Sequence, residues 1–115
     1  MIDDLACSIA AAAKTIPGGI LVFFPSYSLM NKCYDQWENS NVLGIIQKYK
    51  PVYREPKIAA EYQLIMDRYY SAVFEEEDEE RGAILLAVCR GRISEGLDFS
   101  DKAARAVIVV GIPYP

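Results

Sequence analysis

Seven residues between positions 90 and 98 combine the side-chain types that bind phosphate and sugar groups. Glycines let a backbone approach a phosphate closely, arginines supply positive charge, and a carboxylate can accept from a hydroxyl or contact the water shell of a metal ion. An ordinary strand-to-helix connection with solvated charges would have the same composition, so spacing alone leaves both interpretations open. The seven residues are Arg90, Gly91, Arg92, Ser94, Glu95, Gly96 and Asp98.

The elements around this segment are expected to form an α/β domain. The apolar run Ile84–Val88, which ends just before Arg90, is typical of a buried strand in a parallel sheet. Strands are also predicted at 20–24, 51–54 and 106–110, and helices at 5–14, 27–38, 42–48 and 58–74. Such alternation indicates βαβ units and a mainly parallel sheet. Open sheets of this kind bind ligands beyond the carboxyl ends of their strands, where the segment begins.

Several side chains have expected positions within these elements. Ser26 precedes the helix at 27–38 and should cap it, since its hydroxyl can accept from an unpaired N–H of the first turn. Gln63 and Asp67 lie four residues apart and should form part of a solvated stripe on the helix at 58–74. Trp37 and Tyr69 lie on helical stripes and are expected in the core rather than stacked on bases.

The composition excludes several classes of protein. The chain has 115 residues, 52% of them hydrophobic and 24% charged, as in a single globular domain. No apolar run approaches the ~18 residues of a membrane span. There is no histidine, the commonest general base and zinc ligand, so a self-contained hydrolase is disfavoured and no metal site is expected. Cys7, Cys33 and Cys89 are expected to be reduced thiols, mostly in the core.

The net charge of −4 comes from one acidic segment, which we call the acidic loop (residues 75–81). It holds six of the 16 acidic residues and one of the 12 basic residues, Arg81, which leaves ten acidic against 11 basic residues elsewhere. Such a run is usually a solvated loop, although a partner-binding or self-repelling insert has the same composition. In either case it should extend away from a nucleic acid, because like charges repel.

Three segments resemble motifs of the XPD-like DNA helicases, the iron–sulfur branch of helicase superfamily two. Residues 87–101, AVCRGRISEGLDFSD, resemble motif V and depart from it only at Arg92, where Lys is usual. Residues 19–27, GILVFFPSY, resemble motif IV, and residues 105–115 resemble the strand that leads towards motif VI. Trp37 and residues 52–56 also fall where relatives have similar residues. The likeness points to the branch with the regulator of telomere elongation helicase and the Fanconi anaemia group J helicase.

The resemblance implies a RecA-like fold of the P-loop NTPase type and a role for each motif residue. Glu95, Gly96 and Asp98 match the part of motif V that faces ATP and Mg²⁺. A second set matches segments that face the backbone of single-stranded DNA, without sequence readout. Helix capping remains an alternative role for Ser26, and a half-buried helix position for Tyr27. The DNA-facing set is Ser26, Tyr27, Arg90, Gly91, Arg92 and Ser94.

The chain is expected to be an incomplete second motor domain, spanning residues 1–115 and carrying motifs IV and V. It has no G-x-x-x-x-G-K-[ST] loop and no Asp-Glu-Ala-His box, and its cysteines do not match those that bind the 4Fe-4S cluster of the family. ATP and Mg²⁺ would therefore be shared with the first RecA-like motor domain, and this fragment should hold no catalytic residue and be inactive alone. The parent is expected to be a nuclear 5′→3′ helicase of DNA repair, recombination or telomere maintenance.

Two other classes remain open. The chain could be a non-catalytic α/β interaction module that retained the motifs, or an unrelated doubly wound nucleotide-binding domain. The second would need a glycine-rich phosphate loop after the first strand, where residues 24–27, Phe-Pro-Ser-Tyr, stand instead.

Overall fold

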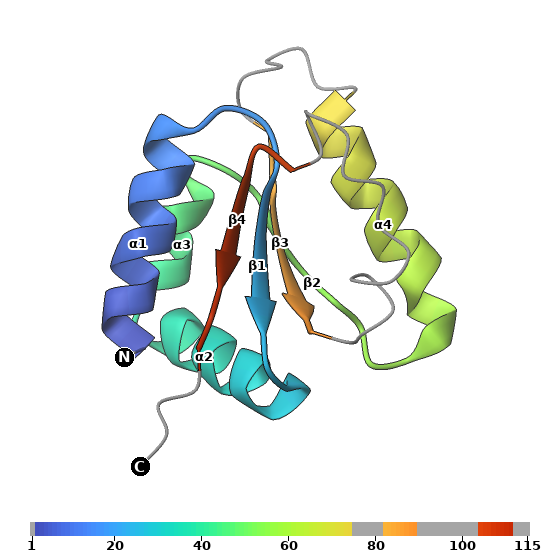
Figure 1. Cartoon of the computed structure of the whole chain (residues 1–115), viewed down its shortest axis with the longest axis horizontal. Helices are drawn as coiled ribbons and strands as arrows, with labels where there is room; N and C mark the ends of the chain where they lie inside the picture. Colours follow the sequence, from blue (N-terminus) through green and yellow to red (C-terminus); the bar gives the residue numbers. More distant parts are fainter. Residues whose placement is uncertain (1, 75–81, 90–103, 112–115) are drawn as a thin grey trace.

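The computed structural model describes residues 2–74, 82–89 and 104–111, which form a parallel sheet flanked by helices (Figure 1). The strands follow the order β2-β3-β1-β4, and all three neighbouring pairs are parallel. This is the RecA-like α/β architecture that the alternation of elements and the motifs predicted. The elements are α1 (Ile2–Thr15), β1 (Ile20–Phe24), α2 (Tyr27–Asn39), α3 (Val42–Gln47), β2 (Val52–Arg54), α4 (Ala59–Phe74), β3 (Ile84–Val88) and β4 (Ala106–Val109).

Helices cover both faces of the sheet, which explains why its central strands are continuous apolar runs. Every residue of β1 and β3 is buried, and alternate side chains point to opposite faces. Ile20, Val22 and Phe24 belong to the core that α1, α2 and α3 close, whereas Leu21 and Phe23 belong to the core under α4. Figure 1 shows α1 and α3 on one side of the sheet and α4 on the other.

The helices use the faces that the sequence predicted. Trp37 of α2 is 1% exposed and Tyr69 of α4 is fully buried, so both are core residues. On the solvated side of α4, Gln63 Nε2 donates to Asp67 Oδ1 over 2.7 Å. Among the described residues, no helix has both the length and the apolar character that a membrane span requires.

The amino ends of β1 and β3 meet at an unusually close backbone contact. Gly82, at φ +66°, lies against Gly18, at φ +82°, and a Cβ placed on Gly82 would be 1.9 Å from the Gly18 carbonyl oxygen. Positive φ and this lack of space both favour glycine. The contact fixes the start of β3 on β1, so the two strands enter the sheet together.

Candidate functional site

The carboxyl edge of the sheet brings together the described residues of the two segments that resemble motifs IV and V. Strands β1 and β3 are parallel neighbours, with Phe24 opposite Val88. Beyond them the Cys89 N–H donates to the Phe24 carbonyl oxygen over 2.8 Å. Cys89, the last described residue before position 90, therefore lies at the same edge as Ser26 and Tyr27, where a parallel sheet binds ligands.

Ser26 is the N-cap of α2, as predicted. Its backbone is extended, with φ −155° and ψ 157°, and its Oγ accepts from the Leu29 N–H over 3.2 Å. The side chain is exposed. Because Oγ acts as the acceptor in the cap, the hydroxyl proton can still be donated to a group outside the helix. Capping and phosphate contact are thus compatible roles for this one side chain.

Tyr27 is half-buried and its hydroxyl is part of an internal contact. It donates to Glu55 Oε2 over 2.6 Å. Glu55 is itself only 2% exposed, and its other oxygen, Oε1, accepts from the Val88 N–H over 3.2 Å. The phenol proton of Tyr27 is therefore directed into the protein, while the side chain as a whole stays partly exposed.

Glu55 is a site residue that sequence reasoning did not identify. In the sequence, residues 52–56 stand out only as a point of likeness to relatives. The available signal was a carboxylate directly after a predicted strand and before Pro56, a place where a charged side chain reaches the carboxyl edge of the sheet. Its partners, 28 and 33 residues away in sequence, could not be inferred from that position.

A groove of about 420 Å³ opens next to Glu55, between α2, β2 and the start of α4. Arg54 lies in its wall, where Nη1 donates to Asn31 Oδ1 over 3.1 Å and the guanidinium carbon is 3.9 Å from the centre of the Tyr34 ring. Both contacts hold the cation on α2. They tie the end of β2 to α2.

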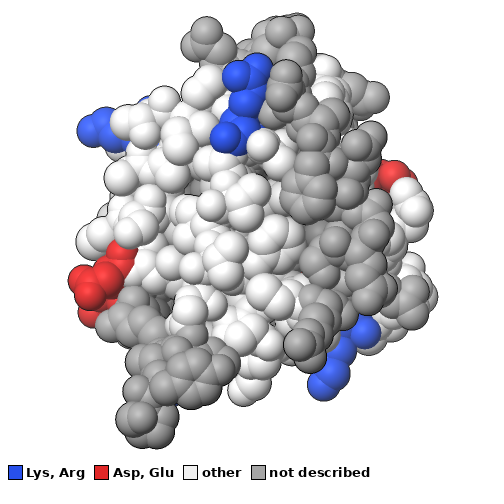
Figure 2. Space-filling model, in the orientation of Figure 1, with Lys and Arg blue, Asp and Glu red and all other residues white. Residues whose placement is uncertain are grey.

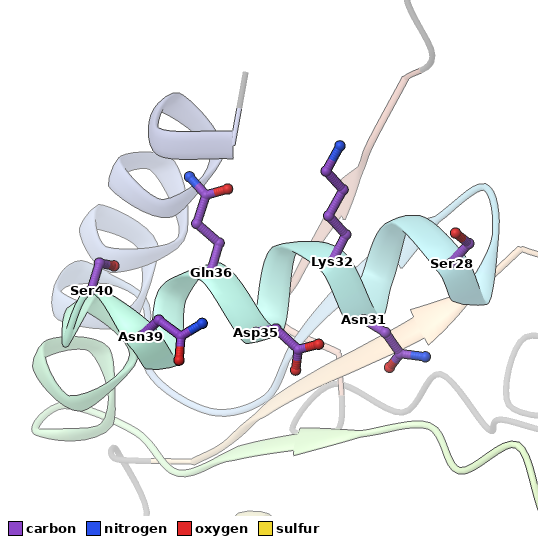
Figure 3. Close-up of a pocket in the computed structure, with 7 residues that line it drawn as sticks. All are labelled: Ser28, Asn31, Lys32, Asp35, Gln36, Asn39 and Ser40. Carbon is purple, nitrogen blue, oxygen red and sulfur yellow. The ribbon is translucent and has the colours of Figure 1, made fainter.

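A second hollow, of about 780 Å³, lies along the exposed surface of α2. Figure 3 shows that its side chains diverge. Lys32 and Gln36 project to one side of the helix, whereas Asn31, Asp35 and Asn39 project to the other. Because these polar side chains point to opposite sides of the helix and all but Asn31 are exposed, we interpret this hollow as a solvated helix face.

Most predicted site residues lie outside the described residues. The acidic loop does as well. On the face shown in Figure 2, the described Lys and Arg side chains lie at separate places and do not form one patch among themselves. The roles predicted for the segment 90–98 therefore stay predictions. The residues concerned are Arg90, Gly91, Arg92, Ser94, Glu95, Gly96 and Asp98.

The cysteines do not lie mostly in the core, contrary to the sequence prediction. Only Cys33 is buried, whereas Cys7 and Cys89 are exposed. Cys7 lies on the solvated face of α1, and Cys89 follows the last residue of β3. Burial raises the pKa of the Cys33 thiol, an effect that the nearby Lys32 charge partly opposes. The three thiols do not fit an iron–sulfur cluster, and the described residues contain no group of three or more His, Cys, Asp or Glu side chains that could hold a metal.

Comparison with known proteins agrees with this arrangement. The family model described as the helicase C-terminal domain matches residues 9–115. The regulator of telomere elongation helicase 1 homologs of Anopheles gambiae, Drosophila melanogaster and Aedes aegypti are 47%, 42% and 42% identical over 114 residues. These alignments cover 99% of this chain and 11% of each relative. The family match begins within α1 and includes both motif-like segments, and the chain therefore belongs to the helicase C-terminal domain family.

Proposed function

We propose that the chain is part of the second motor domain of a longer ATP-dependent 5′→3′ DNA helicase that acts in DNA repair, recombination or telomere maintenance. In this proposal, the backbone of single-stranded DNA is contacted by Ser26, Tyr27, Arg90, Gly91, Arg92 and Ser94. Glu95, Gly96 and Asp98 face ATP and Mg²⁺, which the first motor domain shares. Telomere-related names among the relatives support the setting, and a nuclear location would follow from it.

The observation that carries the proposal is the Cys89–Phe24 hydrogen bond at the carboxyl edge. It puts the start of the motif V segment next to the motif IV segment, so contacts from both can act on one DNA strand. The same continuous segment then runs on to the residues expected to face ATP. A change in the cleft between the two motor domains could thereby alter the grip on DNA, since ligands shift the populations of states to which they bind differently.

The residues in this chain would bind and couple rather than perform the chemistry. Phosphoryl transfer depends on positioned cations and an oriented nucleophile. In the proposed helicase the remaining motor parts supply these, and the cluster-binding cysteines also belong to the first motor domain. We therefore expect residues 1–115 alone to show no ATP hydrolysis.

The test compares two arginines in the full-length protein. Arg90 belongs to the motif V segment and comes two positions after the end of β3 in the sequence. Arg105 is exposed and directly precedes β4, at the amino edge of the sheet. Arg90→Ala should weaken binding to a labelled oligo-dT strand and reduce the salt dependence of that binding. The reason is that DNA binding releases fewer counterions when one phosphate contact is lost. Arg105→Ala removes the same charge and should have a smaller effect.

A second variant, Asp98→Ala, should lower DNA-stimulated ATP hydrolysis. If Arg90→Ala and Asp98→Ala both retain wild-type ATP hydrolysis and unwinding, the helicase proposal fails and a non-catalytic interaction module becomes the better assignment. Robust ATP turnover by residues 1–115 alone would refute the shared-site part of the proposal.

A further inference from the structure

We propose that Glu55 is a positioning residue that fixes the carboxyl end of β3 against the start of α2. As a result, the motif IV and motif V segments meet a ligand as one surface. The inference rests on the proposed function, because that surface is the one assigned above to DNA. Glu55 itself touches neither DNA nor ATP in this proposal, since its side chain is buried.

The strand order makes the reach of Glu55 unusual. Glu55 follows β2 and Tyr27 follows β1, and β3 lies between these two strands. Neighbouring strands are about 4.8 Å apart, so the backbones at the two ends are separated by roughly 10 Å. The Glu55 carboxylate bridges this distance: Oε1 accepts from Val88 at the end of β3, and Oε2 accepts from the Tyr27 hydroxyl.

The backbone of Glu55 is also held by β3. Its N–H donates to the Leu86 carbonyl oxygen over 2.8 Å, which extends the contact between β2 and β3 by one residue. Pro56 then follows, and its ring fixes the direction in which the chain leaves the sheet. A side chain that starts from an anchored backbone can transmit a defined position to its partners, whereas one on a free loop could not.

The burial of the Glu55 carboxylate explains why it should hold Val88 and Tyr27 in one defined arrangement. A buried carboxylate is tolerated only when donors satisfy its oxygens, and a buried donor that loses its acceptor costs about 1–3 kcal/mol. One oxygen has its donor at the end of β3 and the other has its donor at the start of α2. Moving Val88 relative to Tyr27 would break one of these hydrogen bonds, so the carboxylate favours a single arrangement of the two.

The position of Val88 sets the starting point of the motif V segment. The next residue, Cys89, donates its N–H to Phe24 of β1, while Val88 is held from the β2 side by Glu55. The residues just before position 90 are therefore fixed from both neighbouring strands. Without Glu55, the DNA-facing and ATP-facing residues that follow would start from a less defined point relative to α2.

The experiment uses three substitutions in the full-length protein. Glu55→Ala removes both acceptors. Glu55→Gln keeps an amide oxygen for the Val88 N–H and offers an NH₂ group to the Tyr27 hydroxyl oxygen, so it should restore the bridge. Glu61→Ala is the matched control, because Glu61 is an exposed carboxylate that lines the same groove.

Amide hydrogen exchange tests the bridge without DNA. We expect exchange at Val88 to be faster in Glu55→Ala than in wild type, and close to wild type in Glu55→Gln and Glu61→Ala. Unchanged protection of Val88 in Glu55→Ala would overturn the proposal outright, whatever the variants do to activity.

Binding of labelled oligo-dT, with and without a non-hydrolysable ATP analogue, tests the consequence. Glu55→Ala should weaken oligonucleotide affinity and reduce the effect of the analogue on it, by roughly twofold to thirtyfold, the range for residues that couple two sites without touching either ligand. Glu55→Gln should restore both. If the Val88 amide exchanges faster in Glu55→Ala but oligonucleotide affinity and the effect of the ATP analogue on it stay at wild-type values, Glu55 has only a structural role. If the wild type binds no oligonucleotide, the proposed function fails, and the exchange comparison still decides whether Glu55 fixes β3.

Discussion

Lys50 donates a hydrogen bond from Nζ to the carbonyl oxygen of Gly18 over 2.8 Å, although 32 residues separate them in sequence. Lys50 lies just before β2 and is only 1% exposed. Gly18 lies just before β1 and is also the residue that Gly82 approaches at the start of β3. The Gly18 carbonyl is therefore a common contact point for the chain as it enters the three neighbouring strands.

Replacing Lys50 should destabilise the domain. Lys50→Met keeps most of the aliphatic packing but removes a charged donor from a buried carbonyl, which should lower the free energy of unfolding by about 1.5–3 kcal/mol. Urea unfolding would measure the change. Lys48→Met is the control, because Lys48 is exposed and its substitution should change stability by less than about 0.5 kcal/mol. Equal effects of the two substitutions would argue against a structural role for the Lys50 contact.

Two glycines should respond in opposite directions to alanine. Gly82→Ala places a Cβ against the Gly18 backbone at a positive φ, so stability should fall by well over about 1 kcal/mol. Gly44 lies within α3, and nothing is within 4 Å of its added Cβ. Gly44→Ala should therefore raise stability by about 0.5–1 kcal/mol, through a better helix propensity. Thermal unfolding of both variants measures the two changes in stability. If Gly82→Ala leaves stability unchanged, the backbones at Gly18 and Gly82 can move apart without cost.

Substitutions at Ser26 can separate capping from DNA contact. Ser26→Asp retains a good N-cap, so stability should stay near wild type, but it brings a negative charge to the proposed DNA-facing edge. Ser26→Gly loses the cap side chain at a cost of only a few tenths of a kcal/mol. In the full-length protein, oligo-dT affinity should fall clearly more in Ser26→Asp than in Ser26→Gly. Wild-type affinity in Ser26→Asp would leave Ser26 as a cap alone.

Alkaline pH should destabilise the fold through its buried titratable groups. Burial raises the pKa of Cys33 above 9.0 and that of Tyr69 above 10.0, and the nearby Tyr70 adds to the Tyr69 shift. Above these ordinary values the unfolded chain loses protons that the folded chain retains, so the free energy of unfolding falls as pH rises. Urea unfolding between about pH 8 and 11 should show this slope. Tyr69→Phe should reduce the slope, and an unchanged slope would contradict the assignment to Tyr69.

The sequence predicted helices, strands and their buried faces correctly where the evidence lay in neighbouring residues. The Ser26 cap depends on one side chain and the turn beside it, and Trp37 follows from helical periodicity. Cys7 shows the limit of using residue type alone, because a thiol is often buried but the face of α1 that holds this one is solvated. Periodicity, not residue type, decided its exposure.

The contacts of the candidate site depended on strand order, which the sequence did not determine. Alternating strands and helices predict parallel pairing, but they do not say that β3 inserts between β2 and β1. That insertion is what brings Glu55 to Val88 and Tyr27. Residues 52–56 could therefore be noticed by resemblance, while the function of the carboxylate within them could not.

The central place of β3 has a mechanical consequence. A pull on the chain beyond Val88 acts along a strand that is paired on both flanks with parallel neighbours. Such a load shears β3 against its neighbours, so many inter-strand hydrogen bonds share the tension. The hydrogen bonds do not open one at a time. A tether at this exit should therefore bear more force than one attached to an edge strand such as β4, and single-molecule stretching from the two points would compare them.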